Sequence, residues 1–514
     1  MKRFNITGVC NPEEDYMVDT SNKIEKIKRL VDRRSYFTIN RARQYGKSTT
    51  LNMLKRTLSI EYICINLSFE GVGATMFANS QSFCQRFLWQ LDMATEEISW
   101  RNDEATDFDQ LSVHLTQICR DKKIVLMIDE VDKASNHEVF LYFLGMLRNK
   151  FNERKSNIGA TFHSVILAGV HDIKNIKSKM TSDGKYLPFE SEEKKYDSPW
   201  NIADNFNIDM SFSSAEISTM LNGYEAENKT GMNITAISEE IYNYTSGYPF
   251  LASRICQYID EELNKDWTIN GVREAVKILL TEKNTLFDDL FKNLENSKDL
   301  YKLIYDILII GNKRTFNPDN PTLNLGMMYG IIKESERYIA ISNKIFEIRI
   351  CDYFISKDEE KESDNIPMIL QRDVVKNGRF DMELCFRKFA DHYAEIFNKT
   401  DAKFLERHGR LIFLSYLRPL INGRGFYHIE SQFTDLRRMD IVVDYGQDQF
   451  IIELKLWKGE KSHNEAYEQL LDYMESKKAQ TGYLLTFDFR EEANRERKAE
   501  WVKFASKRIF EIII

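Results

Sequence analysis

The sequence has few cysteines, and their spacing does not suit a metal site or a disulfide framework. Seven cysteines are scattered from Cys10 to Cys385, an odd number with no CxxC pair among them. This excludes a zinc ribbon and a disulfide-stapled scaffold. The arrangement is instead typical of reduced, buried thiols in a cytosolic protein.

Long hydrophobic runs and an excess of positive charge are also missing. No segment approaches the roughly 18 consecutive apolar residues of a transmembrane helix, and the N-terminal MKRFNITGVCNPEEDY lacks the apolar stretch of a signal peptide. Lys and Arg total 71 against 79 for Asp and Glu, a net charge of -8, which provides no global basic field for nucleic acid. We therefore expect a cytoplasmic protein without a membrane partner, in which any nucleic-acid surface is local.

What the sequence does contain is enough apolar material for several folded domains. At 514 residues it is too long for one hydrophobic core, and its 43% of hydrophobic residues exclude a largely disordered chain. The length predicts roughly three or four domains.

A phosphate-binding loop is predicted where a β-prone run at 35–40 gives way to RARQYGKS and an amphipathic helix from about Lys47. Backbone N–H groups at the start of such a helix receive phosphate oxygens, Lys47 reaches the β and γ phosphates, and Ser48 ligates Mg²⁺. Gly46 lets the backbone approach the phosphate closely. The pattern GxxxxGK[ST] would have glycine where Arg41 stands, and a surface helix that merely begins with GKS is the alternative.

A second element supports the phosphate site. KIVLMIDEVDKAS predicts a buried parallel strand at 124–128 that ends in Asp129 and Glu130. There Asp129 would hold the Mg²⁺ of a bound nucleotide, and Glu130 would polarise the attacking water as the catalytic base.

Three further strands fit the same sheet, at 62–69, 163–168 and 207–212, with helical patterning between them. GVHDIKN after the second of these places His171 and Asp172 near the γ phosphate, although an ordinary loop histidine is the simpler interpretation of His171. The residues expected around the nucleotide are Arg41, Arg43, Gly46, Lys47, Ser48, Thr49, Asp129 and His171.

These segments resemble the successive blocks of the bacterial AAA-ATPase-like proteins, which often carry a C-terminal PD-(D/E)XK nuclease domain. In that family an arginine commonly replaces the first P-loop glycine, as Arg41 does here. TSGYPF resembles the Gly-Pro motif of the helical lid in related signal-transducing ATPases, so Gly247 and Pro249 would shape a lid beside the nucleotide. The blocks that carry the resemblance are RARQYGKS, LMIDEVDKAS, VILAGVHDIKN, SPWNIADNFNIDMSFS and TSGYPFLASRIC.

The middle of the chain is predicted to be mainly helical. Apolar residues recur at spacings of three and four over 214–355. GIIKESERYIAISNKIFEIRICDYF resembles the winged-helix unit that follows the ATPase in this family, with a wing strand at 338–341, and packing between domains is favoured there over DNA binding because no basic recognition helix stands out. SKDEEKESDN indicates a solvated linker at 356–370.

A second cluster of carboxylates follows. RMDIVVDY and QFIIELKLW read as an antiparallel hairpin around Gly446. If Tyr445 faces Phe450, Asp440 lies opposite Lys455, with Glu453 at the next position on the same face. Such a face suits phosphodiester hydrolysis by carboxylates that bind Mg²⁺ and a lysine that stabilises the transition state, whereas an exposed salt bridge is the alternative.

Asp440, Glu453 and Lys455 resemble the D...ExK core of PD-(D/E)XK nucleases. The resemblance implies that Gln469 and Tyr473, in a QxxxY helix, position the substrate strand, and that Glu406 is a further metal ligand, with Glu430 as a less certain substitute. His408 and Arg410 would meet phosphate, and Arg437 and Arg438 would contact the backbone unless they are simply solvated. Residues 371–514 contain 25 Lys or Arg against 24 Asp or Glu, so the negative charge belongs to the ATPase half.

We therefore expect an α/β protein: a P-loop NTPase of the ASCE type with a parallel sheet (1–213), a helical lid and winged-helix region (214–355), a charged linker (356–370), and a restriction-endonuclease-like PD-(D/E)XK domain (371–514). It would be an ATPase and a nuclease that uses ATP and Mg²⁺, with Mn²⁺ as the alternative at the nuclease site, and that acts on nucleic acid, favoured to be DNA, under nucleotide control. A phage-defence role follows only from the resemblance, and homo-oligomerisation stays open. The rival functions are a nucleotide-switched binding module that does not cut and a chaperone-like ATPase with a protein partner.

Overall fold

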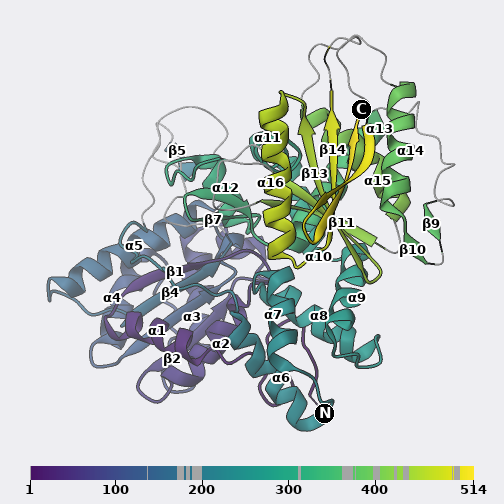
Figure 1. The fold of residues 1–514 in the computed structure, drawn as a ribbon. Helices are drawn as coiled ribbons and strands as arrows, with labels where there is room; N and C mark the ends of the chain where they lie inside the picture. The colour runs from purple at the N-terminus through teal and green to yellow at the C-terminus, as the bar shows by residue number, and fades with distance from the viewer. Residues whose placement is uncertain are drawn as a thin grey trace. The chain divides into compact units, whose positions relative to one another are not determined.

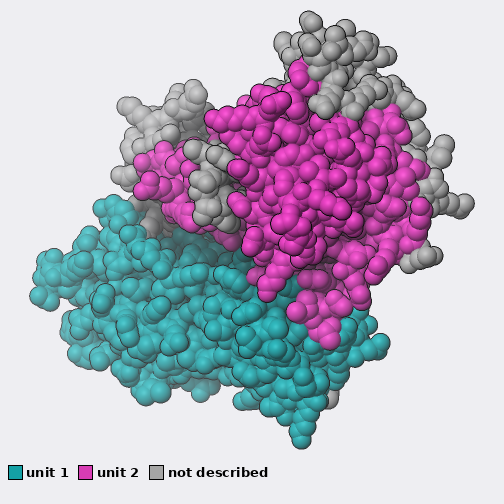
Figure 2. Space-filling model, viewed as in Figure 1, with its two compact units in different colours: residues 1–242, 246–267, 328–330 teal, residues 243–245, 268–327, 331–514 magenta. Residues whose placement is uncertain are grey.

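The computed structural model divides the chain into two compact units, which we describe separately (Figure 2). Unit 1 comprises residues 1–242, 246–267 and 328–330, and unit 2 comprises 243–245, 268–327 and 331–514. The residues that the structure describes are 2–135, 137–170, 179–180, 186–187, 200–310, 314–361, 374–376, 378–396, 406–421, 425–431, 439–488, 490 and 498–514.

Unit 1 is built on a parallel four-stranded sheet with the order β1-β4-β3-β2 (Figure 1). Near-continuous apolar runs suit strands that are covered on both faces, and β3 and β4 are buried along their whole length. This sheet confirms the expected α/β fold. Its strands are β1 (Tyr36–Asn40), β2 (Ile63–Ser68), β3 (Ile124–Asp129) and β4 (Ser164–Gly169).

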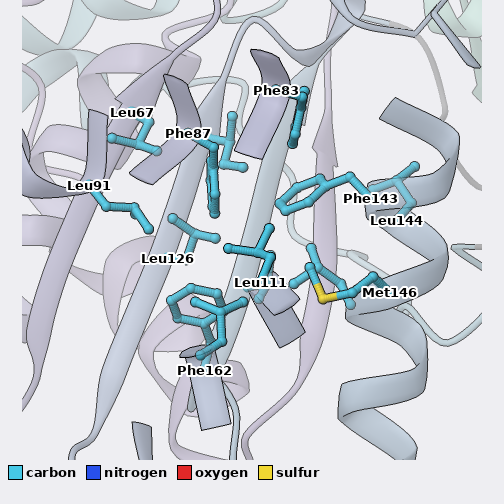
Figure 3. Close-up of a cluster of buried hydrophobic side chains, with 14 of the residues drawn as sticks. Leu67, Phe83, Phe87, Leu91, Leu111, Leu126, Phe143, Leu144, Met146 and Phe162 are labelled. Carbon is cyan, nitrogen blue, oxygen red and sulfur yellow. The ribbon is translucent and has the colours of Figure 1, made fainter. Parts of the chain in front are cut away.

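Helices cover both faces of this sheet. On one face, α1 (Ser21–Asp32) and α2 (Lys47–Leu58) bury their apolar stripes against every second residue of the strands. On the other face lie α3 (Ser80–Ala94), α4 (Phe108–Cys119) and α5 (Glu138–Lys155). Figure 3 shows Phe87, Leu111 and Phe143 of these helices around Leu126 of β3. The shorter elements of this part are η1 (Ala74–Phe77), η2 (Val131–Lys133) and the hairpin of β5 (Lys179–Met180) and β6 (Tyr186–Leu187).

The strand predicted at 207–212 is wrong. Among the described residues of this segment, only an isolated bridge between Asp204 and Phe37 of β1 is formed. The carbonyl of Ile208 instead accepts a hydrogen bond from Arg41 Nη2 at 2.6 Å, and the Arg41 guanidinium lies over the Phe206 ring. A side chain therefore holds this segment in place of a β ladder.

The helical region is divided between the two units. Unit 1 contains α6 (Ser214–Asn228), which begins with a capping box between Ser213 and Glu216, most of α7 (Ile234–Thr245), and α8 (Pro249–Glu261). Unit 2 contains the remaining helices and the antiparallel pair β7–β8, whose second strand is the one expected at 338–341. These elements are α9 (Ile269–Thr281), α10 (Thr285–Asn296), α11 (Lys298–Tyr305), the π-helical turn η4 (Asp306–Ile310), α12 (Pro321–Met328), β7 (Ile332–Ser335), β8 (Tyr338–Ile341) and α13 (Lys344–Lys361).

The expected linker at 356–370 begins inside a helix, because α13 extends to Lys361. Lys and Glu have high helix propensity, so the helix continues past its last apolar residues. The rest of the expected linker, 362–370, lies outside the described residues.

The larger sheet of unit 2 is mixed, with the strand order β11-β12-β13-β14-β16-β15 (Figure 1). β13 pairs in parallel with β14, and β14 with β16, whereas β11, β12 and β15 are antiparallel to their neighbours. The strands are β11 (Gly425–Ser431), β12 (Met439–Tyr445), β13 (Asp448–Leu456), β14 (Thr481–Phe487), β15 (Lys498–Phe504) and β16 (Lys507–Ile513).

One face of this sheet packs against α16 (Glu460–Ser476), which buries Leu470 and Tyr473 against Leu484 of β14. The alternate residues face α14 (Met382–Ile396) and α15 (Glu406–Ile421), where Phe386 packs on Tyr483. The short pair β9 (Val375–Lys376) and β10 (Arg379–Phe380) precedes α14. No described helix of the chain has the length and hydropathy needed to cross a membrane.

The hairpin β12–β13 is tighter than predicted. Tyr445 pairs with Asp448, not with Phe450, and Ile441 pairs with Ile452. Gly446 adopts a φ of 59°, which lets a two-residue turn join the strands. The same register carried one step further brings Asp440 opposite Glu453, so the expected pairing of Asp440 with Lys455 is wrong. The pairing differs from the expected one by two residues, and an even shift keeps Asp440, Glu453 and Lys455 on one face of the sheet.

Candidate active sites

The turn between β1 and α2 has the form of a phosphate-binding loop. Gly46 caps α2 with a φ of 76°, and Lys47 opens the helix. The Lys47 ammonium is buried and donates to the carbonyls of Arg41 and Ala42 at 3.1 and 3.0 Å. Burial lowers the pKa of Lys47, while the carboxylates of Glu130 and Asp129 act in the opposite direction. The loop thus surrounds the Lys47 ammonium at the amino end of α2. Backbone N–H groups at such a helix end also stabilise a phosphate.

The acidic end of β3 lies beside this loop. Ser48 Oγ donates to Asp129 Oδ2 at 2.5 Å. These two oxygens are hard donors of the kind that bind Mg²⁺, so both residues fit the expected metal position. Glu130 has a φ of 54°, unusual for a side chain other than glycine, and burial raises its pKa against the attraction of Lys47.

A cavity of about 340 Å³ opens next to the loop within unit 1. Gly46, Thr49 and Met53 form one side of it, and the N-terminal segment contributes Cys10. Thr49 Oγ1 accepts a hydrogen bond from the Cys10 amide at 3.2 Å, which joins that segment to α2. The apolar lining suits an aromatic base beside the phosphate loop.

The segment predicted to shape a lid contacts the loop directly. Tyr248, which caps α8, donates from its hydroxyl to the carbonyl of Arg43 at 2.6 Å, and its ring packs against Tyr45 with centroids 4.6 Å apart. Gly247 accepts a hydrogen bond from the Phe212 amide at 2.8 Å. Pro249 is the first residue of α8 and lines the cavity.

Two residues near the loop escaped the sequence analysis, and one predicted residue lies outside the described part of the chain. Asp132 Oδ2 accepts from the Val170 amide at 2.6 Å and fixes the end of β4, and Tyr248 contacts the loop as described above. The third acidic residue of IDEVD was the available signal for Asp132. His171 lies outside the described residues. The guanidinium of Arg41 donates to the carbonyl of Asn40 at 2.7 Å as well as to that of Ile208, so it bonds main-chain carbonyls at the end of β1 and in the segment 207–212.

The second site lies between β13 and α16. Glu453 and Lys455 are 1% and 4% exposed, and Glu453 Oε1 is 2.5 Å from Lys455 Nζ. Lys455 also donates to Gln469 Oε1 of α16 at 2.8 Å. Tyr473, one turn further along α16, is buried, and Lys477 lies over its ring. An exposed salt bridge is therefore excluded, because this pair is buried and capped by an amide.

The remaining predicted ligands are placed by their backbone only. Asp440 lies in β12 and pairs with Glu430 of β11, and Glu406 is the first residue of α15. The side chains of these three residues lie outside the described part. Among the described side chains no group of three His, Cys, Asp or Glu residues could hold a metal ion. Glu453 is the described carboxylate that fits such a role, since its oxygens share the sheet face of Asp440.

Of the basic residues predicted to contact phosphate or the backbone near this site, only Arg410 has a described side chain. Arg410 is buried, and its Nη1 lies 3.4 Å from the carbonyl of Ile309, so its expected contact with phosphate is wrong. Apolar residues surround Arg410 in α15, so the helix is buried there. The Arg410 guanidinium therefore lies against the main chain at the end of η4. The side chain of His408 and the whole of Arg437 and Arg438 lie outside the described residues.

The same sheet face carries a buried charged network that the sequence patterns did not predict. Glu511 of β16 is fully buried and meets His463 Nε2 at 2.5 Å, Tyr467 Oη at 2.6 Å and Lys498 Nζ at 3.3 Å. His463 and Tyr467 are one turn apart on α16, so the network fixes that helix on the sheet. The single acidic residue within RIFEIII, Glu511, was the available signal.

Two family models match parts of the chain. Residues 42–176 match the AAA domain family, and residues 426–498 match the PD-(D/E)XK nuclease superfamily. No curated protein matches the chain.

The solved structures that match this chain include the following three. The Walker-type ATPase of Pyrococcus abyssi is 12% identical, with 68% of this chain and 99% of that chain covered and a TM-score of 0.45. The ORC1 protein of Aeropyrum pernix, in complex with DNA, is 9% identical, with 66% and 94% covered and a TM-score of 0.31. The RuvB Holliday junction branch migration motor of Thermotoga maritima is 12% identical, with 68% and 96% covered and a TM-score of 0.32. From its two family matches, the chain is an enzyme with an AAA-type ATPase domain followed by a PD-(D/E)XK nuclease superfamily domain.

Proposed function

We propose that the protein binds and hydrolyses ATP and that its C-terminal domain cleaves phosphodiester bonds of nucleic acid, with DNA as the favoured substrate. The observation that carries the nuclease proposal is the buried pair Glu453 and Lys455, together with the partly buried Gln469 that accepts a hydrogen bond from Lys455. Burying an ion pair costs desolvation energy that an apolar pair would avoid, so its presence under α16 favours a chemical role.

On the ATPase side, each residue has a role that its position supports. The amino end of α2 and Lys47 would hold the phosphates, and Ser48 and Asp129 would hold Mg²⁺. Glu130 would orient and deprotonate the attacking water, for which a raised pKa is suited.

On the nuclease side, Glu453 together with Asp440 would hold Mg²⁺, or Mn²⁺ as the alternative, and Glu406 would complete the set. The bound metal would supply Lewis-acid activation of the phosphate and of water. Lys455 would stabilise the charge that develops on the phosphate, and Gln469 keeps its ammonium in place. Tyr473 would position the strand from the next turn of α16.

We further propose that nucleotide state controls the nuclease. The chain passes from unit 1 into unit 2 and back at residues 243–245. Tyr248, whose hydroxyl donates to the loop carbonyl of Arg43, follows three residues later. The chain enters unit 1 again at 328–330, where Gly330 lies so close to Ala42 that an added Cβ would come within 2.8 Å. Both passages therefore adjoin the phosphate loop, which supports a coupling through the chain.

Several finer points belong to the same proposal. The four-part division at 213, 355 and 370, a winged-helix unit built around β7–β8, and a role in phage defence are proposed on the sequence resemblance. Cytoplasmic location is proposed on the seven free thiols.

The test is cleavage of labelled linear DNA, circular DNA and RNA by purified protein with Mg²⁺ or Mn²⁺, with and without ATP. We expect metal-dependent cleavage that is lost in Lys455→Ala and Asp440→Ala and altered in Lys47→Ala, which should also lose ATP binding. Lys55→Ala on the same helix as Lys47 is the matched control. Wild-type protein that cuts nothing under all conditions but binds nucleic acid would replace the nuclease by a nucleotide-switched binding module.

A further inference from the structure

A second cavity, of about 450 Å³, lies at the opposite edge of the unit 1 sheet from the phosphate loop. Most of its lining comes from segments directly before β1, β3 and β4, namely Arg34, residues 119–123, residues 157–161 and His163. Thr116 of α4 and Arg154 of α5 complete the lining. These strands are parallel, so the cavity is at their amino ends, whereas the phosphate loop and Glu130 follow their carboxyl ends. Strands of five or six residues separate the two edges by roughly 17–20 Å.

Positive charge dominates the lining of this cavity. Its basic side chains are Arg34, Arg120, Lys122, Lys123 and Arg154, and its single lining carboxylate is Asp121. Arg34, Arg120 and Lys122 are exposed, and in the described part of the chain none of the three forms an ion pair. Like charges gathered without counter-ions repel one another, so an anion would be bound favourably there.

A partly buried arginine, Arg154, forms part of the cavity wall. Arg154 Nη1 donates to the carbonyls of Phe162 and His163 at 2.5 and 2.8 Å, and its Nη2 donates to the carbonyl of Arg34 at 2.8 Å. Its guanidinium lies over the Tyr36 ring. These bonds from one side chain hold the main chain before β1 to the main chain before β4, so they fix this wall of the cavity.

Below the lining, Lys150 is 2% exposed, and its ammonium contacts Thr116 Oγ1 and, at 2.9 Å, Glu153 Oε2. Thr116 itself lines the cavity. Glu153 offsets the charge of Lys150, so the anion site depends on the lining residues above it.

A buried polar atom at this cavity also points to a ligand. His163 lines the cavity and is 9% exposed, and its Nε2 has no hydrogen-bond partner in the described structure. Burial and the charges of Arg34 and Arg154 lower the pKa of His163 to about 4. The neutral ring thus presents an unused polar atom, and a protonated phosphate oxygen is a donor that could satisfy it.

We propose that this cavity binds phosphate groups, supplied either by a small polyphosphate or by a nucleic-acid backbone. Guanidinium and ammonium groups form charge-assisted hydrogen bonds with phosphate oxygens, and the cavity offers them from three separate segments around one buried histidine. The proposal stands apart from the ATPase and nuclease proposals, because it uses none of their residues.

The test uses the full chain with its nucleotide site saturated with ADP and Mg²⁺. One arm titrates sodium tripolyphosphate by calorimetry, and the other titrates a fluorescein-labelled DNA duplex by anisotropy. Arg120→Ala/Lys122→Ala removes two exposed lining cations. Lys26→Ala/Arg29→Ala removes the same two charges from exposed positions of α1 outside the lining. The cavity variant should weaken binding about tenfold or more, with ADP affinity unchanged, and the control should not.

The two arms identify the source of the phosphate. Selective weakening of tripolyphosphate binding assigns the cavity to a small anion, and selective weakening of DNA binding assigns it to a backbone. Equal weakening in both double variants would show a non-specific charge effect and overturn the proposal, as would the absence of binding in both arms. His163→Phe, which keeps an aromatic ring but removes Nε2, should also weaken binding while its thermal midpoint is followed to confirm folding.

Discussion

At the scale of single residues, burial sets the chemistry of both candidate sites. Burial shifts the pKa values of Lys47 and Glu130 in opposite directions. It lowers the pKa of the Lys47 ammonium and raises that of the Glu130 carboxyl. Glu453 and Lys455 are buried still more completely, and they neutralise each other at 2.5 Å. Each group can therefore be tested through stability as well as through activity.

For Glu130 the pH dependence has a definite sign. Its pKa is raised in the folded protein, so the folded state binds this proton more readily than the unfolded chain. Its contribution is therefore full below the ordinary glutamate pKa and is lost as the pH rises through the raised value. Glu130→Gln should be more stable than wild type at pH 7 and should lose this part of the pH profile in urea unfolding.

Exposed Glu96→Gln is the control for the loss of one negative charge. If the two variants give the same pH profile, burial does not govern Glu130. ATP hydrolysis should fall in Glu130→Gln with little change in ATP affinity, since the residue acts on water and not on the phosphates.

For the buried ion pair, removing one partner should cost more than removing both. Lys455→Met leaves the Glu453 carboxylate buried without its cation, which should lower the free energy of unfolding by about 3–5 kcal/mol. The double variant Glu453→Gln/Lys455→Met should recover most of that loss. Urea unfolding at neutral pH measures all three proteins, and a single variant that costs under about 1 kcal/mol would mean that the pair behaves as an exposed one.

At the scale of elements, the turn between α7 and α8 places the lid against the phosphate loop. Ser246 and Gly247 have φ values of 45° and 72°, so two successive residues adopt left-handed backbone. This reverses the chain and brings Tyr248 to Arg43. An added Cβ at Gly247 would lie 1.8 Å from the Phe212 carbonyl oxygen, which leaves no room for any other residue.

Gly247→Ala should therefore destabilise unit 1 by more than about 2 kcal/mol, because both the positive φ and the clash with backbone oppose it. Gly223 in α6 is the matched control, since a Cβ there meets nothing within 4 Å and alanine should stabilise the helix by about 0.5–1 kcal/mol. Thermal and urea unfolding measure both variants. A neutral Gly247→Ala would mean that the turn can open without loss.

At the scale of the whole molecule, the two units are joined by chain passages that adjoin the phosphate loop at Tyr248 and Gly330. A ligand can shift another site only through contacts that differ between states. The hydrogen bond from Tyr248 to Arg43 is the contact through which we propose this coupling, because the loop carbonyl it uses belongs to the segment that would surround phosphate.

Tyr248→Phe should leave ATP affinity within a few-fold of wild type and reduce the effect of ATP on DNA cleavage. The ring that packs on Tyr45 is kept, and only the hydroxyl is lost. Tyr142→Phe, which removes an exposed hydroxyl on α5, is the control. The measured quantity is the DNA cleavage rate with ATP divided by the rate without ATP. If this ratio is unchanged in Tyr248→Phe, coupling does not pass through this contact.

The local patterns in the sequence were sufficient for much of the fold. Apolar runs that end in GKS or in Asp129 and Glu130 predicted β1, α2 and β3, because strand and helix periods and loop chemistry are local properties. The alternation in β13 likewise placed Glu453 and Lys455 on one face. The strand predicted at 207–212 failed because a distant side chain, Arg41, bonds its backbone.

What the sequence determined by itself, then, is the order of the elements and the types of side chain at each site. Only the tertiary structure decided which distant residues meet: Tyr248 with Arg43, Gln469 with Lys455, and His463 with Glu511. It also set the hairpin register, since two-residue and longer turns both suit YGQD. These outcomes depend on how helices and strands pack across long separations in the chain, and no local period encodes that geometry.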